Sequence, residues 1–391
     1  MLKRVYADNN ATTPLHPKVQ EAIIEALPLF GNASSLHSFG REAKAKIDEA
    51  RAAIATFLGA DPAEIIFTGG GTESNNTVLN NLSCSSTVCA HKQCVPHIIT
   101  SKIEHPSVLA TVKCLVDQGV EVTYVKVDKY GMVDPHDIQK EIKSNTRLIS
   151  IMYANNEIGT IQPIKEISRI ANQHNILMHT DAIQASGKIP FKVSDLGVDF
   201  LSLSGHKVYA TKGVGVLYVK KGTRFCPLIH GGHHEHSRRA GTENTLGIIA
   251  MGKAVEMLDR EMDAEIPRLK KLRQKLSDGI TNSISEVSFN GHPTEFQPGT
   301  LNVSFSYIEG ESILLHLDLE GIAVSTGSAC ASGSLEPSHV LRAIGVPIED
   351  VHSSIRFSLG RENTAEDVDY ILEKLPPIVE KLRKLSPLIR S

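Results

Sequence analysis

The chain has 391 residues, of which 41% are hydrophobic and 22% are charged, so it has the composition of an ordinary globular protein whose length suggests two domains. The net charge of −3 argues against a partner such as nucleic acid or an anionic membrane. No apolar run of about 18 residues or more occurs, and no signal peptide opens the chain, so no membrane span is expected. Six scattered cysteines do not form a disulfide framework, which favours a reducing cytoplasm.

Short β-branched runs alternate with amphipathic patterns between residues 60 and 220. The runs predicted to be strands lie at 64–68, 97–101, 121–127, 147–153, 175–181, 199–204 and 213–219. Between them lie patterns such as residues 163–174, where Ile164, Ile167 and Ala171 share one helical face. This alternation predicts an α/β fold with a mostly parallel, seven-stranded sheet covered by helices.

The pattern changes after residue 245. A long helical stretch leads into strand 301–307, helix 311–321, strand 322–326, helix 338–345, strand 354–360 and a last helix from Ala365. This order predicts an α+β unit. We therefore expect a large α/β domain at 15–260 and a smaller α+β domain at 261–391, with residues 1–14 as a candidate to pack on the smaller one.

The sequence TGGGTESNN at 68–76 places glycines directly after a strand and at the start of a helix. Glycine lets backbone N–H groups approach an anion, and a helix N-terminus adds a partial positive charge, to which the Thr72 hydroxyl could contribute. The spacing fits neither a P-loop nor a dinucleotide-binding motif. A tight strand-to-helix turn with a threonine N-cap is an equally open alternative.

Two further polar groups follow predicted strands. Asp181 ends one strand, with Gln184 three residues later, and Lys207 follows the next strand beside Ser204 and His206. Ligands of open α/β sheets bind beyond the carboxyl ends of strands, although a helix cap and a surface lysine are the simpler alternatives. Together, an anion cradle, an acid and a lysine are the groups that pyridoxal phosphate (PLP) needs for its phosphate, its ring nitrogen and its Schiff base.

The whole sequence resembles the NifS/IscS family of cysteine desulfurases, most of all the nitrogen-fixation type, within the class V, fold-type I PLP enzymes. The resemblance rests on blocks that occur in order along most of the chain: YADNNATTPLHPKV, FGNASSLHSFG, FTGGGTESNN, EHPSVL, ANNEIGT, HTDAIQASGK, SLSGHK, RRAGTEN, GSACASGSLEPSHVLRAIG and SSIRFSLGR. It implies the PLP-dependent transferase fold of type I, PLP as the cofactor and a homodimer.

The resemblance also implies roles for individual residues. Lys207 would carry the coenzyme, Asp181 would pair with its ring nitrogen, and His105 would stack on the ring and shuttle protons. Gln184 and Asn156 would lie near the ring hydroxyl, Asn156 also near the substrate. The residues implied to hold the phosphate are Gly71, Thr72, Ser204 and His206, with Thr242 of the partner subunit.

Arg356 has support from the strand pattern as well. Ile355, Phe357 and Leu359 alternate on one strand face, which places Arg356 on the other. A planar guanidinium suits a bidentate grip on an amino-acid carboxylate. A surface ion pair is the common alternative for an arginine on a strand.

Cys330 lies among small residues, in STGSACASGS, between a strand and a helix. An ordinary thiol is mostly protonated at neutral pH, so this one needs an activating group, for which His105 is the candidate. The resemblance implies that Cys330 takes sulfur from L-cysteine as a persulfide, leaving L-alanine. An iron–sulfur scaffold protein is the implied acceptor, for which Cys330 could transiently ligate a cluster, and tRNA thiolation stays open. Selenocysteine lyase, another class V enzyme or a non-catalytic sulfur-handling scaffold are the alternatives.

Two clusters outside these blocks invite a metal-site interpretation. Cys84, Cys89 and Cys94 lie in a segment without a family counterpart, and three ligands without a clear fourth make a poor zinc site. The histidine-rich residues 230–239 match a glycine-rich family loop. Incidental residues are therefore the favoured interpretation of both. The chain departs from the family pattern at Ala33, Thr211 and His236.

Overall fold

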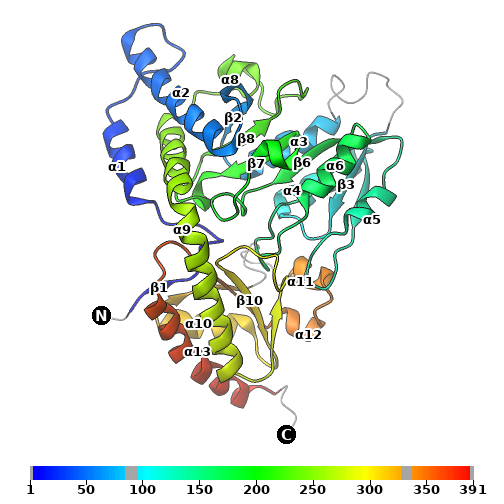
Figure 1. Cartoon of the computed structure of the whole chain (residues 1–391), viewed down its shortest axis with the longest axis vertical. Helices are drawn as coiled ribbons and strands as arrows, with labels where there is room; N and C mark the ends of the chain where they lie inside the picture. The colour runs from blue at the N-terminus through cyan, green and yellow to red at the C-terminus, as the bar shows by residue number, and fades with distance from the viewer. Residues whose placement is uncertain (1–2, 84–94, 327–336, 388–391) are drawn as a thin grey trace.

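A seven-stranded sheet forms the centre of the larger body of the molecule (Figure 1). The computed structural model describes residues 3–83, 95–326 and 337–387. In sheet order the strands are β2 (Ile65–Thr68), β8 (Gly215–Val219), β7 (Phe200–Ser204), β6 (Leu177–Asp181), β5 (Thr146–Ser150), β3 (His97–Ser101) and β4 (Glu121–Val125). Only β8 runs antiparallel to its neighbours. The predicted α/β fold with a mostly parallel seven-stranded sheet is confirmed.

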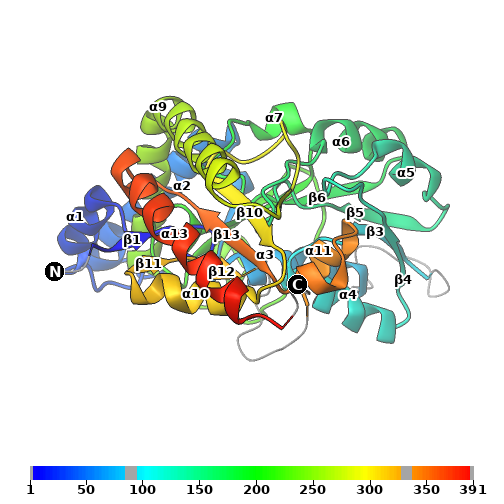
Figure 2. The ribbon, with the colours of Figure 1, turned by 90° about the horizontal axis from the view of Figure 1, so that it is seen from below.

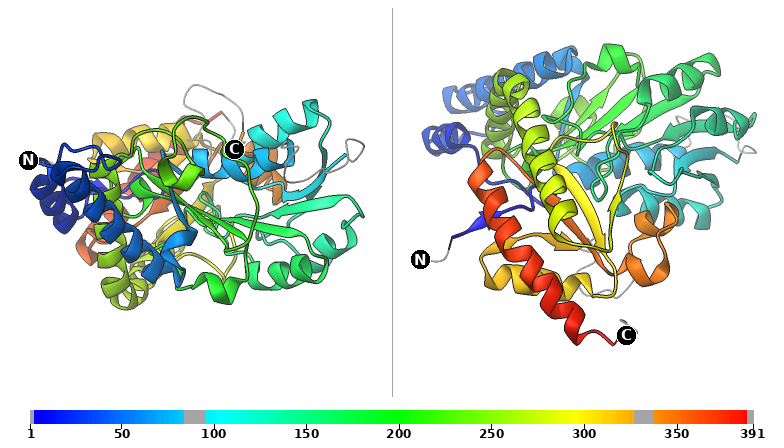
Figure 3. Two further views of the ribbon diagram at one scale, coloured as in Figure 1. Left: turned by 90° about the horizontal axis from the view of Figure 1, so that it is seen from above. Right: turned by 60° about the horizontal axis from the view of Figure 1, so that its bottom comes forward.

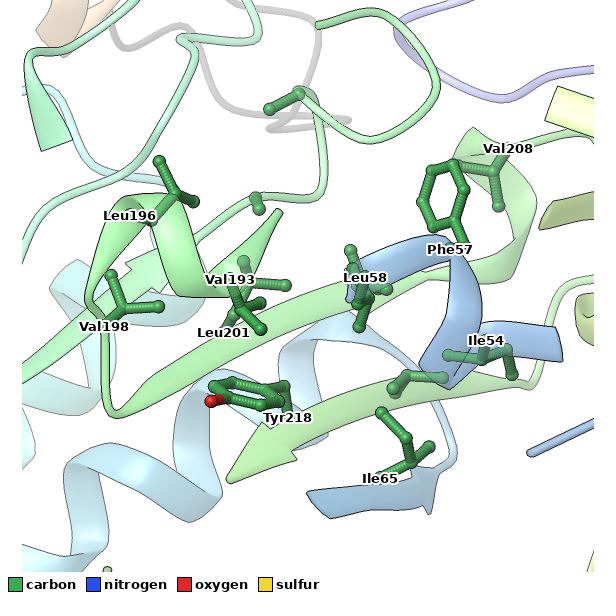
Figure 4. Close-up of a cluster of buried hydrophobic side chains, with 14 of the residues drawn as sticks. Ile54, Phe57, Leu58, Ile65, Val193, Leu196, Val198, Leu201, Val208 and Tyr218 are labelled. Atoms are coloured by element: carbon green, nitrogen blue, oxygen red, sulfur yellow. The ribbon is translucent and has the colours of Figure 1, made fainter. Parts of the chain in front are cut away.

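Helices cover both faces of this sheet because its strands are apolar on both faces. The helices of this body are α1 (Pro17–Ala26), α2 (Ser38–Leu58), α3 (Gly71–Asn80), α4 (Pro106–Asp117), α5 (Pro135–Lys140), α6 (Ile164–Gln173), α7 (Val193–Leu196) and α8 (His234–Ser237). Along β2, Ile65 joins the core under α2, α6 and α7, whereas Ile66 joins the core under α3 and α4. Figure 4 shows part of the first core, with Ile54 and Leu58 of α2 beside Ile65 and Tyr218.

A second, antiparallel sheet has its own core, with helices α10 (Gly310–Leu319) and α13 (Ala365–Leu385) packed on it (Figure 2). In sheet order its strands are β12 (Ser325–Thr326), β13 (Ser354–Ser358), β10 (Thr300–Phe305) and β9 (Val287–Asn290). The short helices α11 (His339–Ala343) and α12 (Ile348–Val351) precede β13. Near the N-terminus, β1 (Val5–Tyr6) pairs in parallel with β11 (Ile322–Ala323), so this short strand lies beside the second unit.

One long helix, α9 (Thr245–Ser283), belongs to both bodies, as Figures 1 and 3 show. Its first part, including Ile248 and Leu258, packs in the core of the larger sheet. Its second part, including Leu269 and Ile280, packs in the core of the smaller sheet. The predicted division at residue 260 falls inside this helix and stays a prediction. No helix in the described part of the chain has the length and apolarity to cross a bilayer.

The second core provides a test of the packing. Phe357 is fully buried on β13 and lies opposite Leu301 of β10. We expect Phe357→Ala to lower the free energy of unfolding by about 3–5 kcal/mol, because it removes a buried ring and leaves a cavity. Leu319→Ala, at a 75% exposed position on α10, is the matched control and should change it little. Urea unfolding followed by circular dichroism measures both, and equal losses for the two variants would contradict this packing.

Candidate active site

A cleft with a volume of about 1020 Å³ lies at the carboxyl ends of β6 and β7 and is closed on one side by β13 of the second sheet. Parallel strands that end at one edge bring their terminal side chains together. The predicted site residues that line this cleft are Gly71, Thr72, His105, Asn156, Asp181, Gln184, Ser204, His206, Lys207 and Arg356. Residues spread over nearly 290 positions of the sequence thus share one cleft.

The N-terminus of α3 forms the anion cradle. Its N-cap is Gly70, with a φ of +155° and no side-chain hydrogen bond to the first turn, so the alternative of a threonine N-cap is wrong. A Cβ at Gly70 would meet nothing within 4 Å, whereas one at Gly71 would lie 2.1 Å from Ile183. Backbone N–H groups at this helix end therefore lack a side-chain acceptor and lie beside open space. This is the arrangement that a phosphate group fits.

Glu73 carries a negative charge in the first turn of α3, next to the cradle. Its Oε2 accepts from the Gly69 N–H at 2.8 Å, which fixes the glycine turn. Its Oε1 accepts from Arg239 Nε at 2.9 Å, and this ion pair neutralises the charge. The carboxylate thus shapes the cradle without repelling an anion from it.

Asp181, at the end of β6, is buried. Its Oδ2 accepts from Asn75 Nδ2 at 2.7 Å and its Oδ1 accepts from the Ile183 N–H at 3.0 Å, which fixes the carboxyl group. Burial raises the pKa of Asp181, and the nearby His105 opposes this rise. In the described part of the chain, no Lys or Arg forms an ion pair with it. A cationic ring nitrogen would supply the missing opposite charge.

His105 is the N-cap of α4, and its ring is held by the same turn. Nδ1 accepts from the Ser107 N–H at 3.1 Å and lies 2.8 Å from Ser107 Oγ, so the ring hydrogen belongs on Nε2. Burial lowers the pKa of His105, which favours the neutral ring, and the nearby Asp181 opposes this shift. A neutral imidazole in the cleft can take up a proton during a reaction.

Lys207 lies in the turn Gly205–Lys207 that follows β7. Its Nζ donates to the carbonyl oxygens of Asn10 at 2.7 Å and Ala11 at 2.6 Å. Burial lowers the pKa of the neighbouring His206 to about 4, so this ring is neutral beside the lysine. The N-terminal segment therefore orients the amine that the sequence predicts to hold the coenzyme.

Arg356 is only 2% exposed, so the alternative of a surface ion pair is wrong. Its Nη2 donates to Asp8 Oδ1 at 2.8 Å and its Nη1 donates to the Asn156 carbonyl oxygen at 3.0 Å. Nε is buried and has no hydrogen-bond partner among the described residues. The two contacts hold the guanidinium in a fixed plane at the cleft and use one hydrogen of each Nη, which leaves Nη donors for an incoming carboxylate.

Sequence reasoning missed three residues that orient these groups: Asp8, Asn10 and Asn75. Asp8 and Asn10 belong to the block YADNNATT, and Asn75 belongs to TGGGTESNN, so the signal was their presence in the two blocks. Asn10 Nδ2 donates to the Asn156 carbonyl oxygen at 3.1 Å. Each of the three therefore forms a hydrogen bond with a predicted site residue: Asp8 with Arg356, Asn10 with Asn156, and Asn75 with Asp181.

Two predicted site residues are not placed in the cleft. Thr242 is exposed and does not line it. Cys330 lies outside the described residues, as do Cys84, Cys89 and Cys94. Of the remaining cysteines, Cys114 is free and exposed, whereas Cys226 is disulfide-bonded, so not all six scattered cysteines are the free thiols that a reducing compartment would favour.

Among the described residues, which include the histidine-rich segment at 230–239, no three His, Cys, Asp or Glu side chains are grouped so that they could hold a metal ion. Its buried member is Glu235, whose carboxylate pairs with Arg51 at 2.6 Å and accepts from the Phe67 N–H at 3.0 Å. Through Glu235, this segment is therefore bound to α2 and β2, which is a structural role.

Comparison with known proteins agrees with this geometry. The family model for aminotransferase class-V matches residues 5–371. Cysteine desulfurase IscS of Dictyoglomus turgidum is 54% identical over 99% of this chain and 97% of its own length. Cysteine desulfurase IscS of Methanosarcina thermophila is 52% identical over 99% of this chain and 94% of its own length.

Solved structures give the same result. A NifS-like protein superposes with a TM-score of 0.90 at 40% identity, over 97% of this chain and all of its own. The structure described as SspA in complex with cysteine has a TM-score of 0.80 at 36% identity, over 91% of this chain and 98% of its own. The chain belongs to the PLP-dependent aminotransferase class-V family, within its NifS/IscS cysteine desulfurases.

Proposed function

We propose that this protein removes sulfur from L-cysteine in a PLP-dependent reaction that yields L-alanine and a persulfide on Cys330. The observation that carries the proposal is one cleft that combines an uncapped helix N-terminus, a buried acid, a lysine and a buried arginine. The first three are the groups that PLP requires, and the fourth suits the carboxylate of an amino acid.

The cleft residues fit the coenzyme, whose role when bound is to accept the electron pair that a departing Cα proton leaves behind. Lys207 would hold it covalently, Asp181 would face its ring nitrogen, and His105 would lie against the ring. Gln184 and Asn156 would lie near its hydroxyl group. The phosphate would be held by Gly71, Thr72, Ser204 and His206, together with Thr242 of the partner subunit.

Four side chains perform the steps on the substrate. Arg356 binds the carboxylate of L-cysteine, and Lys207 takes the Cα proton. The Cys330 thiolate bonds to the substrate sulfur while the Cβ–S bond breaks, and the carbon fragment takes up a proton. The overall change is balanced: L-cysteine and one protein thiol give L-alanine and one protein persulfide. Burial favours the neutral ring of His105, so this ring accepts the thiol proton that the attack requires.

A homodimer completes the proposal. Phe30, Leu36 and Phe39 are 79%, 89% and 52% exposed around the start of α2, an unusual cluster of large apolar side chains for a free surface. Because Thr242 lies outside its own cleft, it is available to a second subunit.

We also propose a cytoplasmic location and an iron–sulfur scaffold protein as the acceptor of the sulfur, for which Cys330 could serve as a transient cluster ligand.

Binding of the substrate carboxylate by Arg356 can be tested separately from the sulfur-transfer steps. We expect Arg356→Ala to raise KM for L-cysteine about 10- to 100-fold, because a buried, charge-assisted contact is lost. Arg260→Ala, at an exposed position on α9, is the matched control and should leave KM unchanged. Steady-state alanine release measures both. An unaltered KM in a folded Arg356→Ala enzyme would move the carboxylate site elsewhere.

The roles of the lysine and the cysteine can also be separated. Cys330→Ser should bind PLP normally and still show a spectral response to L-cysteine, because the cleft residues are untouched. It should release no alanine, since a hydroxyl is a poor nucleophile toward sulfur. Cys114→Ser, at a free exposed thiol, is the control and should be fully active. A fully active Cys330→Ser enzyme, with persulfide found by mass spectrometry on Cys84, Cys89 or Cys94, would overturn this assignment.

A further inference from the structure

Lys188 is a partly buried lysine behind the cleft, seven residues after Asp181. It does not line the cleft itself. It lines a small cavity of about 30 Å³ on the other side of Asn10 and Lys207, next to α9. The amine therefore contacts residues that line the cleft without lining the cleft itself.

The Lys188 amine donates two hydrogen bonds to side-chain amides. Nζ lies 2.6 Å from Gln184 Oε1 and 3.1 Å from Asn10 Oδ1. It has no carboxylate partner within ion-pair distance in the described part of the chain. Both hydrogen-bond partners of this amine are therefore side-chain amides of residues that line the cleft.

The contact with Gln184 decides which way that amide points. An ammonium group is only a donor, so the atom at 2.6 Å must be the amide oxygen. The amide nitrogen then donates one hydrogen to the Asn10 carbonyl oxygen at 2.9 Å. Its second hydrogen is left for the cleft, which Gln184 lines. Gln184 thus offers the cleft a donor rather than an acceptor.

The contact with Asn10 has the same effect on a second amide. With Oδ1 bound to Lys188, Asn10 Nδ2 donates to the Asn156 carbonyl oxygen at 3.1 Å and to Thr300 Oγ1 at 2.8 Å. The backbone oxygen of the same Asn10 accepts from Lys207. One amine therefore fixes both the side chain beside Asn156 and the residue that orients Lys207.

The charged amine has no acceptor and therefore fixes the two amide oxygens most strictly, whereas the neutral amine keeps two N–H groups for them and gains a lone pair. Burial lowers the pKa of Lys188 to about 7, with smaller contributions from the positive charges of Lys207 and Arg356. Two carboxylates on α9, Glu261 and Glu265, line the same small cavity. A neutral amine keeps two N–H groups, so both amide oxygens keep a donor when the proton is lost.

We propose that Lys188 is a positioning residue that fixes the amide orientations of Gln184 and Asn10 and thereby presents a hydrogen-bond donor to the coenzyme ring hydroxyl. The inference rests on the proposed function, since it assumes that Gln184 faces the coenzyme. It requires no contact between Lys188 and any ligand.

A double-mutant cycle on coenzyme affinity tests this role. Apo-protein is titrated with PLP, and the dissociation constant and absorbance spectrum are recorded for the wild type, Lys188→Met, Gln184→Ala and the double variant. We expect each single change to weaken binding about tenfold, the size of one lost hydrogen bond. The double variant should lose clearly less than the additive hundredfold, because Lys188 acts in part through Gln184; any further loss beyond Gln184→Ala reports the contact with Asn10. An additive, roughly hundredfold loss would overturn the proposal, as would unchanged binding by Lys188→Met.

Two controls separate positioning from a general loss of structure. Lys165→Met makes the same change at an exposed position on α6 and should not alter PLP binding. Lys188→Arg keeps donors and should bind PLP within about threefold of the wild type, whereas a loss equal to that of Lys188→Met would contradict the proposal. Thermal unfolding of each apo-protein reports folding, and the cycle uses Lys188→Ala if Lys188→Met does not fold. Absence of alanine release by the wild type would instead refute the proposed function, and the binding cycle would stay interpretable.

Discussion

The segment from Asp8 to Thr13 joins the two sheets at the cleft, and the arrangement of the site depends on it. On one side, the Asn9 N–H donates to the Ser358 carbonyl oxygen at 3.0 Å, and Asp8 pairs with Arg356. On the other side, the Thr13 N–H donates to the His206 carbonyl oxygen at 2.8 Å, and Asn10 accepts from Lys207. The strand that carries the arginine and the turn that carries the lysine are therefore held at a fixed separation by one short stretch of backbone.

Around this segment the protein buries acidic groups that have few cationic partners. Burial raises the pKa of Asp181, and it raises that of Glu104, next to His105 in the chain, to about 8. A pKa that is higher in the folded than in the unfolded chain means that the coenzyme-free protein loses stability as pH rises from about 4.5 to 8. A cationic ring nitrogen beside Asp181 would offset part of this cost. The electrostatics of the cleft thus favour a positively charged ligand group next to a bound anion.

Much of the fold and of the cleft could be predicted because the signals are local. Asp181 and Lys207 each follow an apolar run, and a parallel sheet brings such strand ends together whatever the details of packing. Alternation along β13 was enough to place Arg356 on the face opposite Phe357. The turn before α3 was harder, since the sequence left an anion cradle and a turn with a threonine N-cap as open alternatives, and the structure has Gly70 as the N-cap.

Other features depend on contacts between distant parts of the chain. Asp8 meets Arg356 across 348 positions, and Asn10 meets Lys207 across 197, so no spacing in the sequence reveals either pair. The strand β9 is only four residues long and is paired along one edge, to β10, which leaves too short a pattern to recognise. Lys188 appeared in a family block without a role, because its role depends on the two amides around it.

The proposed function depends on Lys207, in this cleft, converting L-cysteine to L-alanine. The most direct measurement is the release of alanine and of protein-bound sulfur by PLP-loaded protein supplied with L-cysteine, for the wild type and for Lys207→Ala. We expect equal amounts of alanine and transferred sulfur from the wild type and none from Lys207→Ala. A keto acid in place of alanine, or alanine release by Lys207→Ala at the wild-type rate, would contradict it.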